Sequence, residues 1–97
     1  MLLEIVSPES KLYEGEVDLV NLPGSNGTFG ILENHAPLIS TLKEGTVRFL
    51  QRKGGNNKFD EASGRLIHDP KNDEEISIEI KSGVVEVNNN KVIVLVE

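Results

Sequence analysis

The sequence contains no cysteine and no tryptophan, and its aromatic residues are limited to three phenylalanines and one tyrosine. Without cysteine the chain can form neither a disulfide nor a thiolate zinc site, and it cannot carry out redox chemistry through thiols. The scarcity of aromatic side chains also leaves little surface on which a ligand such as a sugar could stack. These absences exclude thiol-based chemistry and disfavour binding by aromatic stacking.

Long apolar runs and clustered positive charges are missing as well. No stretch approaches the roughly 20 apolar residues that a membrane-spanning helix needs. The first residues, MLLEIVSPESK, include Glu4 and reach Pro8 early, so they do not resemble the basic and then apolar start of a signal peptide. Ten Lys and Arg are scattered among sixteen Asp and Glu, giving a net charge of −6. Because nucleic acids are bound mainly through clustered cations, we expect no nucleic-acid partner.

What the sequence does contain is apolar residues at a spacing of two. The segment ISIEIK places Ile76, Ile78 and Ile80 on one face and polar residues on the other, which is typical of a half-buried strand. The closing GVVEVNNNKVIVLVE predicts a hairpin with Asn88 to Asn90 in its turn, because asparagine tolerates the left-handed backbone of tight turns. The last strand is apolar on both faces, so we expect it at the centre of a sheet.

Short segments of this kind follow one another along the chain, with Gly, Pro or Asn at nearly every boundary and no convincing helical periodicity. The pattern predicts an all-β chain that folds as a single domain, a flattened antiparallel β-sandwich or barrel. In VDLVNL, Val17 and Leu19 share one phase, whereas Val20 and Leu22 share the other. Either both faces of this strand are buried or a β-bulge shifts its register.

A long polar segment, rich in glycine and charge, interrupts the strands at about 53–75. Connections of this length are uncommon in compact domains. We expect a loop insertion that is partly disordered on the basis of its composition, with Phe59, Leu66 and Ile67 as the residues able to fix it to the body. Its adjacent acidic residues are interpreted as solvated charge, not as a calcium or acid–base site.

His35 is the first candidate for chemistry, since imidazole titrates near neutral pH and can act as a base or a ligand. The surrounding ENHAPL offers no paired acid at a recognisable spacing, and a zinc site would need more ligands than His35 and the only other histidine, His68. The segment PGSNG lacks the lysine and the helix of a phosphate loop and is better interpreted as a tight turn. We therefore predict no catalytic residue, no cofactor and no metal.

Several segments, in order along the chain, resemble a known family. The run LEIVSPESKLYEGEVDLVNLPGSNGTFGILENHAPLISTLKEGTVR, followed later by SGVVEVNNNKVIVLVE, closely resembles the amino-terminal domain of the epsilon subunit of F-type ATP synthases. The most specific parts are IVSPE, LPGSNGTFGIL, HAPLI with LKEGTV after it, and the final hairpin. The resemblance implies a sandwich of about ten strands at the foot of the central rotor stalk, with no active site of its own.

The resemblance also implies two contact sites, each assigned position by position. The HAPL motif falls where the family meets the gamma subunit, which implies His35, Ala36, Pro37 and Leu38, with Thr41 as a weaker candidate. The GSNGT turn falls where the family approaches the c-ring, which implies Ser25, Asn26, Gly27 and Thr28. The chain would then act in a complex that moves protons or sodium ions. It would be bound peripherally at the cytoplasmic face of a bacterial inner membrane.

The sequence departs from the family in three respects. Asn26 and Thr28 stand where members often have acidic residues, so hydrogen bonding would have to replace an ionic contact with the ring. The chain ends at Glu97, where many members continue into a helical hairpin, so we expect no ATP binding and interpret the chain as a natural one-domain form. The segment 53–75 replaces what is a short turn in most members.

Two other functional classes are compatible with the composition. A free-standing β-sandwich module that binds a peptide or a sugar is the main alternative, although the chain has few aromatic residues for stacking. An enzyme is the third interpretation, and it has little support because no nucleophile, base and orienting group converge in the sequence.

Overall fold

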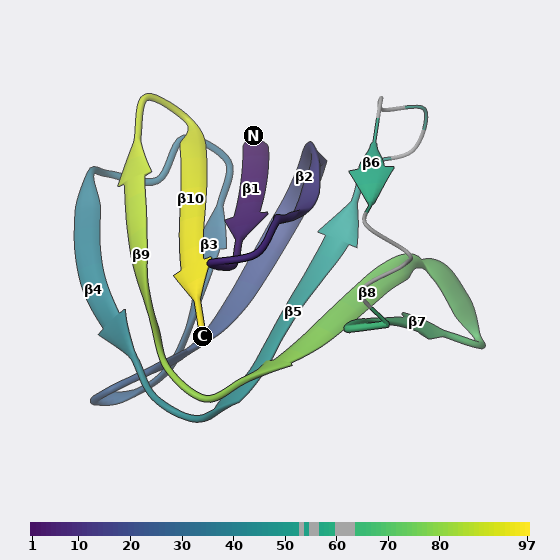
Figure 1. Cartoon of the computed structure of the whole chain (residues 1–97). Helices are drawn as coiled ribbons and strands as arrows, with labels where there is room; N and C mark the ends of the chain where they lie inside the picture. Colours follow the sequence, from purple (N-terminus) through teal and green to yellow (C-terminus); the bar gives the residue numbers. More distant parts are fainter. Residues whose placement is uncertain (53, 55–56, 60–63) are drawn as a thin grey trace.

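The computed structural model of the chain describes residues 1–52, 54, 57–59 and 64–97, and it is built of β-strands (Figure 1). The strands are β1 (Leu2–Val6), β2 (Lys11–Gly24), β3 (Gly27–Leu32), β4 (Leu38–Leu42), β5 (Gly45–Gln51), β6 (Lys58–Phe59), β7 (Leu66–Asp69), β8 (Asn72–Ile80), β9 (Gly83–Asn88) and β10 (Lys91–Val96). None of the described segments forms a helix that is able to cross a membrane. The predicted all-β fold with a single sandwich domain is confirmed.

The strands are joined in the order β1-β10-β9-β4-β2-β5-β8-β7, with β3 and β6 paired to β2. Strand β1, which stands at one end of this order, also pairs with β2, which stands in the middle of it. The pairings are antiparallel except for β1 with β10, which is parallel. The fold therefore has two halves, one containing β4, β9, β10 and β1, and the other containing β3, β5, β8 and β7.

Strand β2 belongs to both halves. Its first part pairs with β1 and β6, and its second part pairs with β3 and β5. In its pairing with β5 the register shifts between Val17 and Leu19. Val17 is buried before the shift, Asp18 is exposed, and Val20 and Leu22 are buried after it. Of the two alternatives that the sequence leaves open, the structure shows the β-bulge. It shifts the core-facing positions from Val17 before the bulge to Val20 and Leu22 after it.

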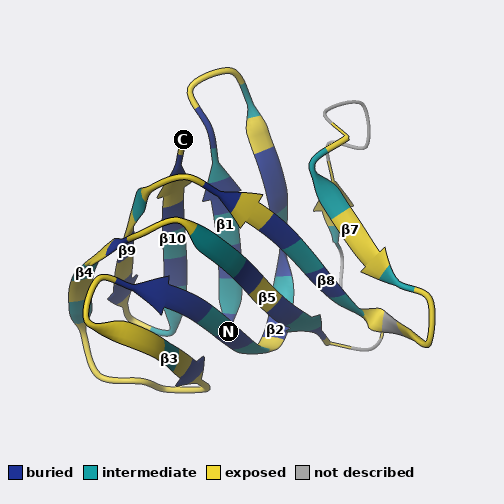
Figure 2. Ribbon diagram, turned by 90° about the horizontal axis from the view of Figure 1, so that it is seen from below, coloured by how far each residue is buried: buried dark blue, intermediate teal, exposed yellow. Residues whose placement is uncertain are grey.

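The core lies between the two halves, and the positions that contribute to it are the buried ones, dark blue along the strands in Figure 2. Ile76, Ile78 and Ile80 are buried, as their spacing predicts. Tyr13 and Phe49 pack together with their ring centroids 4.5 Å apart. The Tyr13 hydroxyl donates a hydrogen bond to Oε1 of Gln51 over 3.2 Å, and burial raises the pKa of Tyr13 above its usual range. The largest core side chain therefore stays neutral and has its polar atom paired.

The hairpin between β9 and β10 turns through Asn89 and Asn90, whose φ angles are 51° and 60°. Two consecutive residues with positive φ are the signature of a type I′ turn, which suits the twist of antiparallel strands. The predicted asparagine hairpin is confirmed, although Asn88 belongs to β9. Strand β10 lies between β1 and β9, so its expected central position is confirmed too.

The description of 53–75 as a loop is wrong for much of its described part. Strands β6 and β7 and the start of β8 lie in it. The Phe59 ring lies 5.7 Å from the Tyr13 ring, and Leu66 packs against the core, whereas Ile67 remains 52% exposed. Polar composition conceals these strands because much of their stability comes from backbone pairing and polar contacts, such as the hydrogen bond from Arg65 to the Glu79 carbonyl oxygen. Residues 53, 55–56 and 60–63, on which the expected disorder also falls, lie outside the described residues.

Candidate interaction surface

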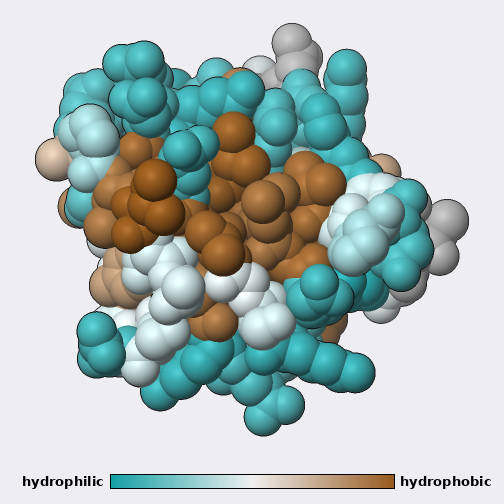
Figure 3. Space-filling view, turned by 60° about the vertical axis from the view of Figure 1, so that its left-hand side comes forward, coloured by the Kyte–Doolittle hydropathy of each residue, from teal (hydrophilic) through white to brown (hydrophobic). Residues whose placement is uncertain are grey.

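The side of the sheet formed by β4, β9 and β10 presents apolar side chains to solvent (Figure 3). Ile39 is 72% exposed, Leu95 52% and Val84 38%. The outward-facing residues of the three strands, which we call the outer face, are Ile39, Thr41, Val84, Glu86, Ile93 and Leu95. Soluble monomers rarely leave a contiguous apolar patch in water, so the outer face indicates a surface for another molecule.

The strand register brings residues of the outer face side by side. Thr41 of β4 pairs with Val84 of β9, and Val84 pairs with Leu95 of β10. Two residues away along each strand, Glu86 of β9 lies between Ile39 of β4 and Ile93 of β10. Directly paired residues on neighbouring strands have side chains in contact range, so each set of three forms one row across the face.

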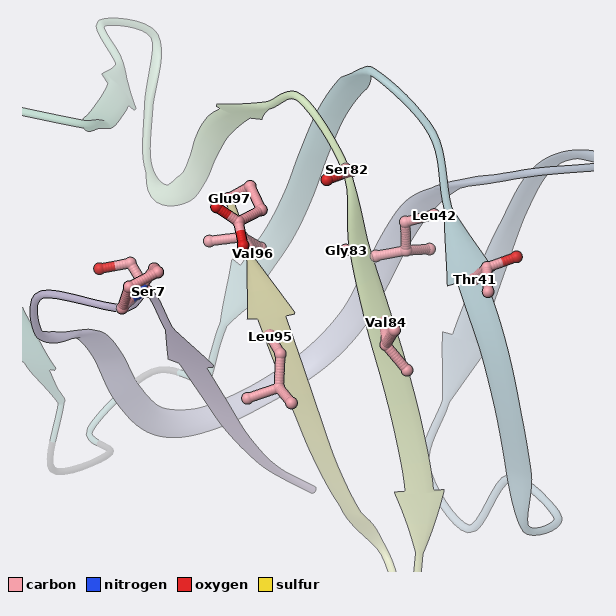
Figure 4. A pocket seen from close by; sticks show the side chains of 10 residues that line it. Ser7, Thr41, Leu42, Ser82, Gly83, Val84, Leu95, Val96 and Glu97 are labelled. Atoms are coloured by element: carbon pink, nitrogen blue, oxygen red, sulfur yellow. The ribbon is translucent and has the colours of Figure 1, made fainter.

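A hollow opens beside the first of these rows, where Val84 and Leu95 meet Thr41 (Figure 4). Ser7 and Ser82 also line this hollow. The Ser7 hydroxyl donates to the carbonyl oxygen of Ser10 over 3.1 Å, which orders the turn after β1. An apolar floor with hydroxyl groups at its edge is the form of site that accepts an apolar side chain from a protein partner.

The structure divides the HAPL residues into two groups. His35, Ala36 and Pro37 are exposed in the loop between β3 and β4. Leu38, the first residue of β4, is only partly exposed and packs against the core. Its neighbour Ile39 is the residue that projects from the strand into solvent. Ile39, Val84 and Leu95 are therefore exposed apolar residues that the assignment from the sequence motif missed.

His35 interacts with the backbone of its own loop. Its N–H donates to the carbonyl oxygen of Leu32 over 3.2 Å, and its Nδ1 lies 2.7 Å from the carbonyl oxygen of Ala36. Since a carbonyl oxygen only accepts, Nδ1 carries the proton in this contact. Within the described part of the chain, no group of three or more His, Asp or Glu side chains is arranged to hold a metal ion.

The loop that carries His35 is attached to the β9–β10 hairpin through Asn90. The Asn90 side chain donates from Nδ2 to Glu33 over 2.8 Å and accepts at Oδ1 from the N–H of Asn34 over 2.8 Å. Arg52 donates to the other oxygen of Glu33 over 2.7 Å. The hydrogen bond from Asn90, the α-ammonium group of Met1 and the charge of Arg52 lower the pKa of Glu33 to about 2. An ionised Glu33 thus fixes the loop ahead of β4.

The turn between β2 and β3 contains the second set of residues assigned from the sequence. Ser25, Asn26, Gly27 and Thr28 are all exposed at this turn. Gly27 has a φ of 129°, a backbone conformation that other residues rarely adopt. The Ser25 hydroxyl lies 2.8 Å from that of Thr41, and the Ser25 N–H donates to the Thr41 carbonyl oxygen over 3.1 Å. The two predicted contact sites are therefore joined directly, at the pair Ser25–Thr41.

Residues 1–64 match the family described as the ATP synthase, Delta/Epsilon chain, beta-sandwich domain. The chain belongs to this family. The resemblance found in the sequence is thereby confirmed. The ATP synthase epsilon chain of Leptospira borgpetersenii is 38% identical over 95 residues, which cover 98% of this chain and 59% of the relative. The epsilon chain of Caulobacter vibrioides is 56% identical over 43 residues, or 44% of this chain and 50% of the relative.

A chain in the cryo-EM structure of the Tetrahymena thermophila mitochondrial ATP synthase, central stalk and c-ring, has a similar fold. The TM-score is 0.59 at 11% sequence identity, and the match covers 99% of this chain and 62% of that chain. At this identity the likeness concerns the fold alone. The match covers nearly the whole chain but only 59% of the Leptospira relative, so the chain corresponds to a part of that protein.

Proposed function

We propose that this chain is a non-catalytic subunit of the central stalk of an F-type ATP synthase and connects the gamma subunit to the c-ring. The observation that carries the proposal is the apolar outer face, which lies directly beside the HAPL loop in a member of the delta/epsilon chain family. The complex would translocate protons or sodium ions. The chain would be associated peripherally with the cytoplasmic face of a bacterial inner membrane.

The gamma subunit is the proposed partner of the outer face and of the HAPL loop. Durable protein interfaces place apolar anchors at the centre and polar groups at the rim. Ile39, Val84 and Leu95 supply the anchors, because they are the exposed apolar residues of these strands. His35, Ala36 and Pro37 form the rim at one end, Thr41 lies at the other end, and Leu38 supports the loop from the core side.

The c-ring is the proposed partner of the turn between β2 and β3. Ser25, Asn26, Gly27 and Thr28 present hydroxyl, amide and backbone groups without charge. Their contact with the polar loops of the ring would rest on hydrogen bonds. The bond between Ser25 and Thr41 supports the idea of one rigid connection, since a load on the turn would pass straight into β4.

Rebinding to an ATP synthase complex from which this chain has been removed tests the proposal. Ile39→Asp should abolish rebinding and leave the fold unchanged, because the side chain is 72% exposed and a carboxylate would be buried at the interface. Ile67→Asp is the matched control, since Ile67 is 52% exposed on β7 and outside the outer face. Rebinding should be measured by co-sedimentation with the complex. The proposal is wrong if the wild-type chain does not rebind, or if Ile39→Asp rebinds as well as Ile67→Asp.

A further inference from the structure

Glu86 occupies an unusual place in the middle of the outer face. It is an exposed residue of β9 and is paired with Ile39 on β4 and with Ile93 on β10. Neighbouring strands lie about 4.8 Å apart, so a single row contains isoleucine, glutamate and isoleucine within roughly 10 Å. Val84, two residues earlier on β9, continues the apolar surface toward Leu95. On the side of the sheet that faces away from the core, the carboxylate thus has the apolar residues Ile39, Ile93 and Val84 on three sides and Asn88 on the fourth.

The carboxylate of Glu86 has no ion pair within the described residues. Lys91, a cation on the adjacent strand β10, is directed to Glu4, with Nζ and Oε1 3.4 Å apart. Glu86 and Asn88 form a ridge between two shallow hollows. One hollow is bounded by Pro37 and Ile39, and the other by Asn89, Lys91 and Ile93. The first hollow connects Glu86 to the loop of the HAPL motif.

A partner that covers the isoleucines on both sides of Glu86 must also remove its carboxylate from water. Burying an unpaired charge is strongly unfavourable, whereas a charge that meets an opposite charge and hydrogen-bond donors keeps most of its stabilisation. Neutral donors would leave the net charge uncompensated, and the chain already carries a net charge of −6. The surface that fits here is therefore apolar with one positive group at its centre.

We infer that the partner of the outer face presents a lysine or arginine side chain to Glu86, between apolar groups that pack on Ile39 and Ile93. This inference rests on the proposed function and specifies the chemistry of the gamma surface. The ion pair determines specificity: the apolar residues provide contact area, and Glu86 selects the one partner and the one register that bring a cation to this position. An apolar surface without such a cation is rejected, because it would leave the carboxylate buried and alone.

Charge-changing variants at Glu86 test the inference in the same rebinding assay. Glu86→Gln keeps the size of the side chain and removes the charge, Glu86→Lys reverses it, and Glu74→Gln makes the same charge change on the exposed surface of β8. Affinity for the depleted complex should fall about 30-fold or more for Glu86→Gln, because removing one charge of a buried pair leaves the partner's cation buried and unpaired. Glu86→Lys should bind more weakly still, and Glu74→Gln should match the wild type.

The salt dependence of binding is a second measurement. It would not differ between wild type and Glu86→Gln if Glu86 only supported the fold. Raising the salt concentration from about 50 to 300 mM should weaken binding of the wild type more than binding of Glu86→Gln, since screening acts on the ion pair. Equal affinity of Glu86→Gln and wild type would overturn the inference, while the proposed function would stand as long as Ile39→Asp still fails to bind. Failure of the wild type to bind would overturn both. All variants should be compared for unchanged thermal unfolding, which excludes loss of the fold as the cause.

Discussion

Ser25 and Thr41 share a hydrogen bond between their hydroxyl groups, with the two oxygens 2.8 Å apart. The bond joins the turn between β2 and β3 to the strand β4, and the backbone N–H of Ser25 reinforces it by donating to the Thr41 carbonyl oxygen. Because the Thr41 hydroxyl is engaged by Ser25, the part of Thr41 left for a partner is chiefly its methyl group. Ser25, which is proposed to contact the c-ring, is in this way bonded directly to Thr41, which is proposed to contact the gamma subunit.

The first prediction concerns this pair. Ser25→Ala and Thr41→Val should each lower the free energy of unfolding by about 0.5–1 kcal/mol, the usual net value of a hydrogen bond. The double variant should be about as stable as the less stable of the two single variants, because both changes remove the same hydrogen bond. Urea denaturation measures these values, with Thr28→Val as the control for a threonine on an exposed strand. Strict additivity of the two changes would show that the hydroxyls do not interact.

The second prediction separates two neighbouring residues of β4. Leu38 packs against the core, so Leu38→Asp should reduce the free energy of unfolding by about 2–4 kcal/mol through burial of a charge. Ile39 is 72% exposed, so Ile39→Asp should change it by no more than about 1 kcal/mol. Chemical denaturation of the two variants under identical conditions decides the matter. A loss at Ile39 as large as that at Leu38 would mean that the outer face is covered within the chain itself.

The third prediction follows from the lowered pKa of Glu33. This pKa is about 2 in the folded chain and about 4.3 in an unfolded one. A carboxyl group whose pKa falls on folding stabilises the fold at pH values above the unfolded pKa, and this stabilisation is lost as the pH falls through the folded pKa. The relevant window therefore runs from about pH 5 down to about pH 2.

Glu33→Gln should accordingly weaken the dependence of stability on pH in that window. The charged groups around Glu33 are the α-ammonium of Met1 and Arg52, which stay positive there, and the acids Glu16 and Asp18 that share Arg52. Thermal unfolding followed at several pH values gives the slope for each protein. Glu74→Gln, on an exposed surface, should retain the wild-type slope. Identical slopes for Glu33→Gln and wild type would contradict the role assigned to the Asn90 hydrogen bond.

Local patterns in the sequence predict much of the fold. The spacing of Ile76, Ile78 and Ile80 identifies a half-buried strand because a β-strand alternates its side chains. The asparagine run identifies the β9–β10 turn because few other residues accept positive φ in succession. The sequence alone does not distinguish the β-bulge near Asp18 from burial of both faces of the strand. Apolar residues at both odd and even positions are compatible with either arrangement.

The candidate surface was only partly predictable. Motif matching located the HAPL loop and the turn at Ser25, but it could not separate Leu38 from Ile39, because exposure depends on which face of β4 meets the core. Leu95 lies in a strand that is apolar on both faces, a pattern equally typical of complete burial, and Val84 shares its face of β9 with the polar residues Glu86 and Asn88. The hydrogen bonds of Asn90 to the Glu33–Asn34 loop span more than half of the sequence, and nothing local signals them.

Strand β2 passes without interruption from the half that contains β1 to the half that contains β3 and β5. In a β-sandwich the two sheets pack face to face through side chains that interdigitate in the core. Here the main chain itself crosses from one half to the other, bent at the bulge near Asp18. Sideways displacement of one half would have to break the ladder hydrogen bonds along β2, so the domain should resist shear as one body.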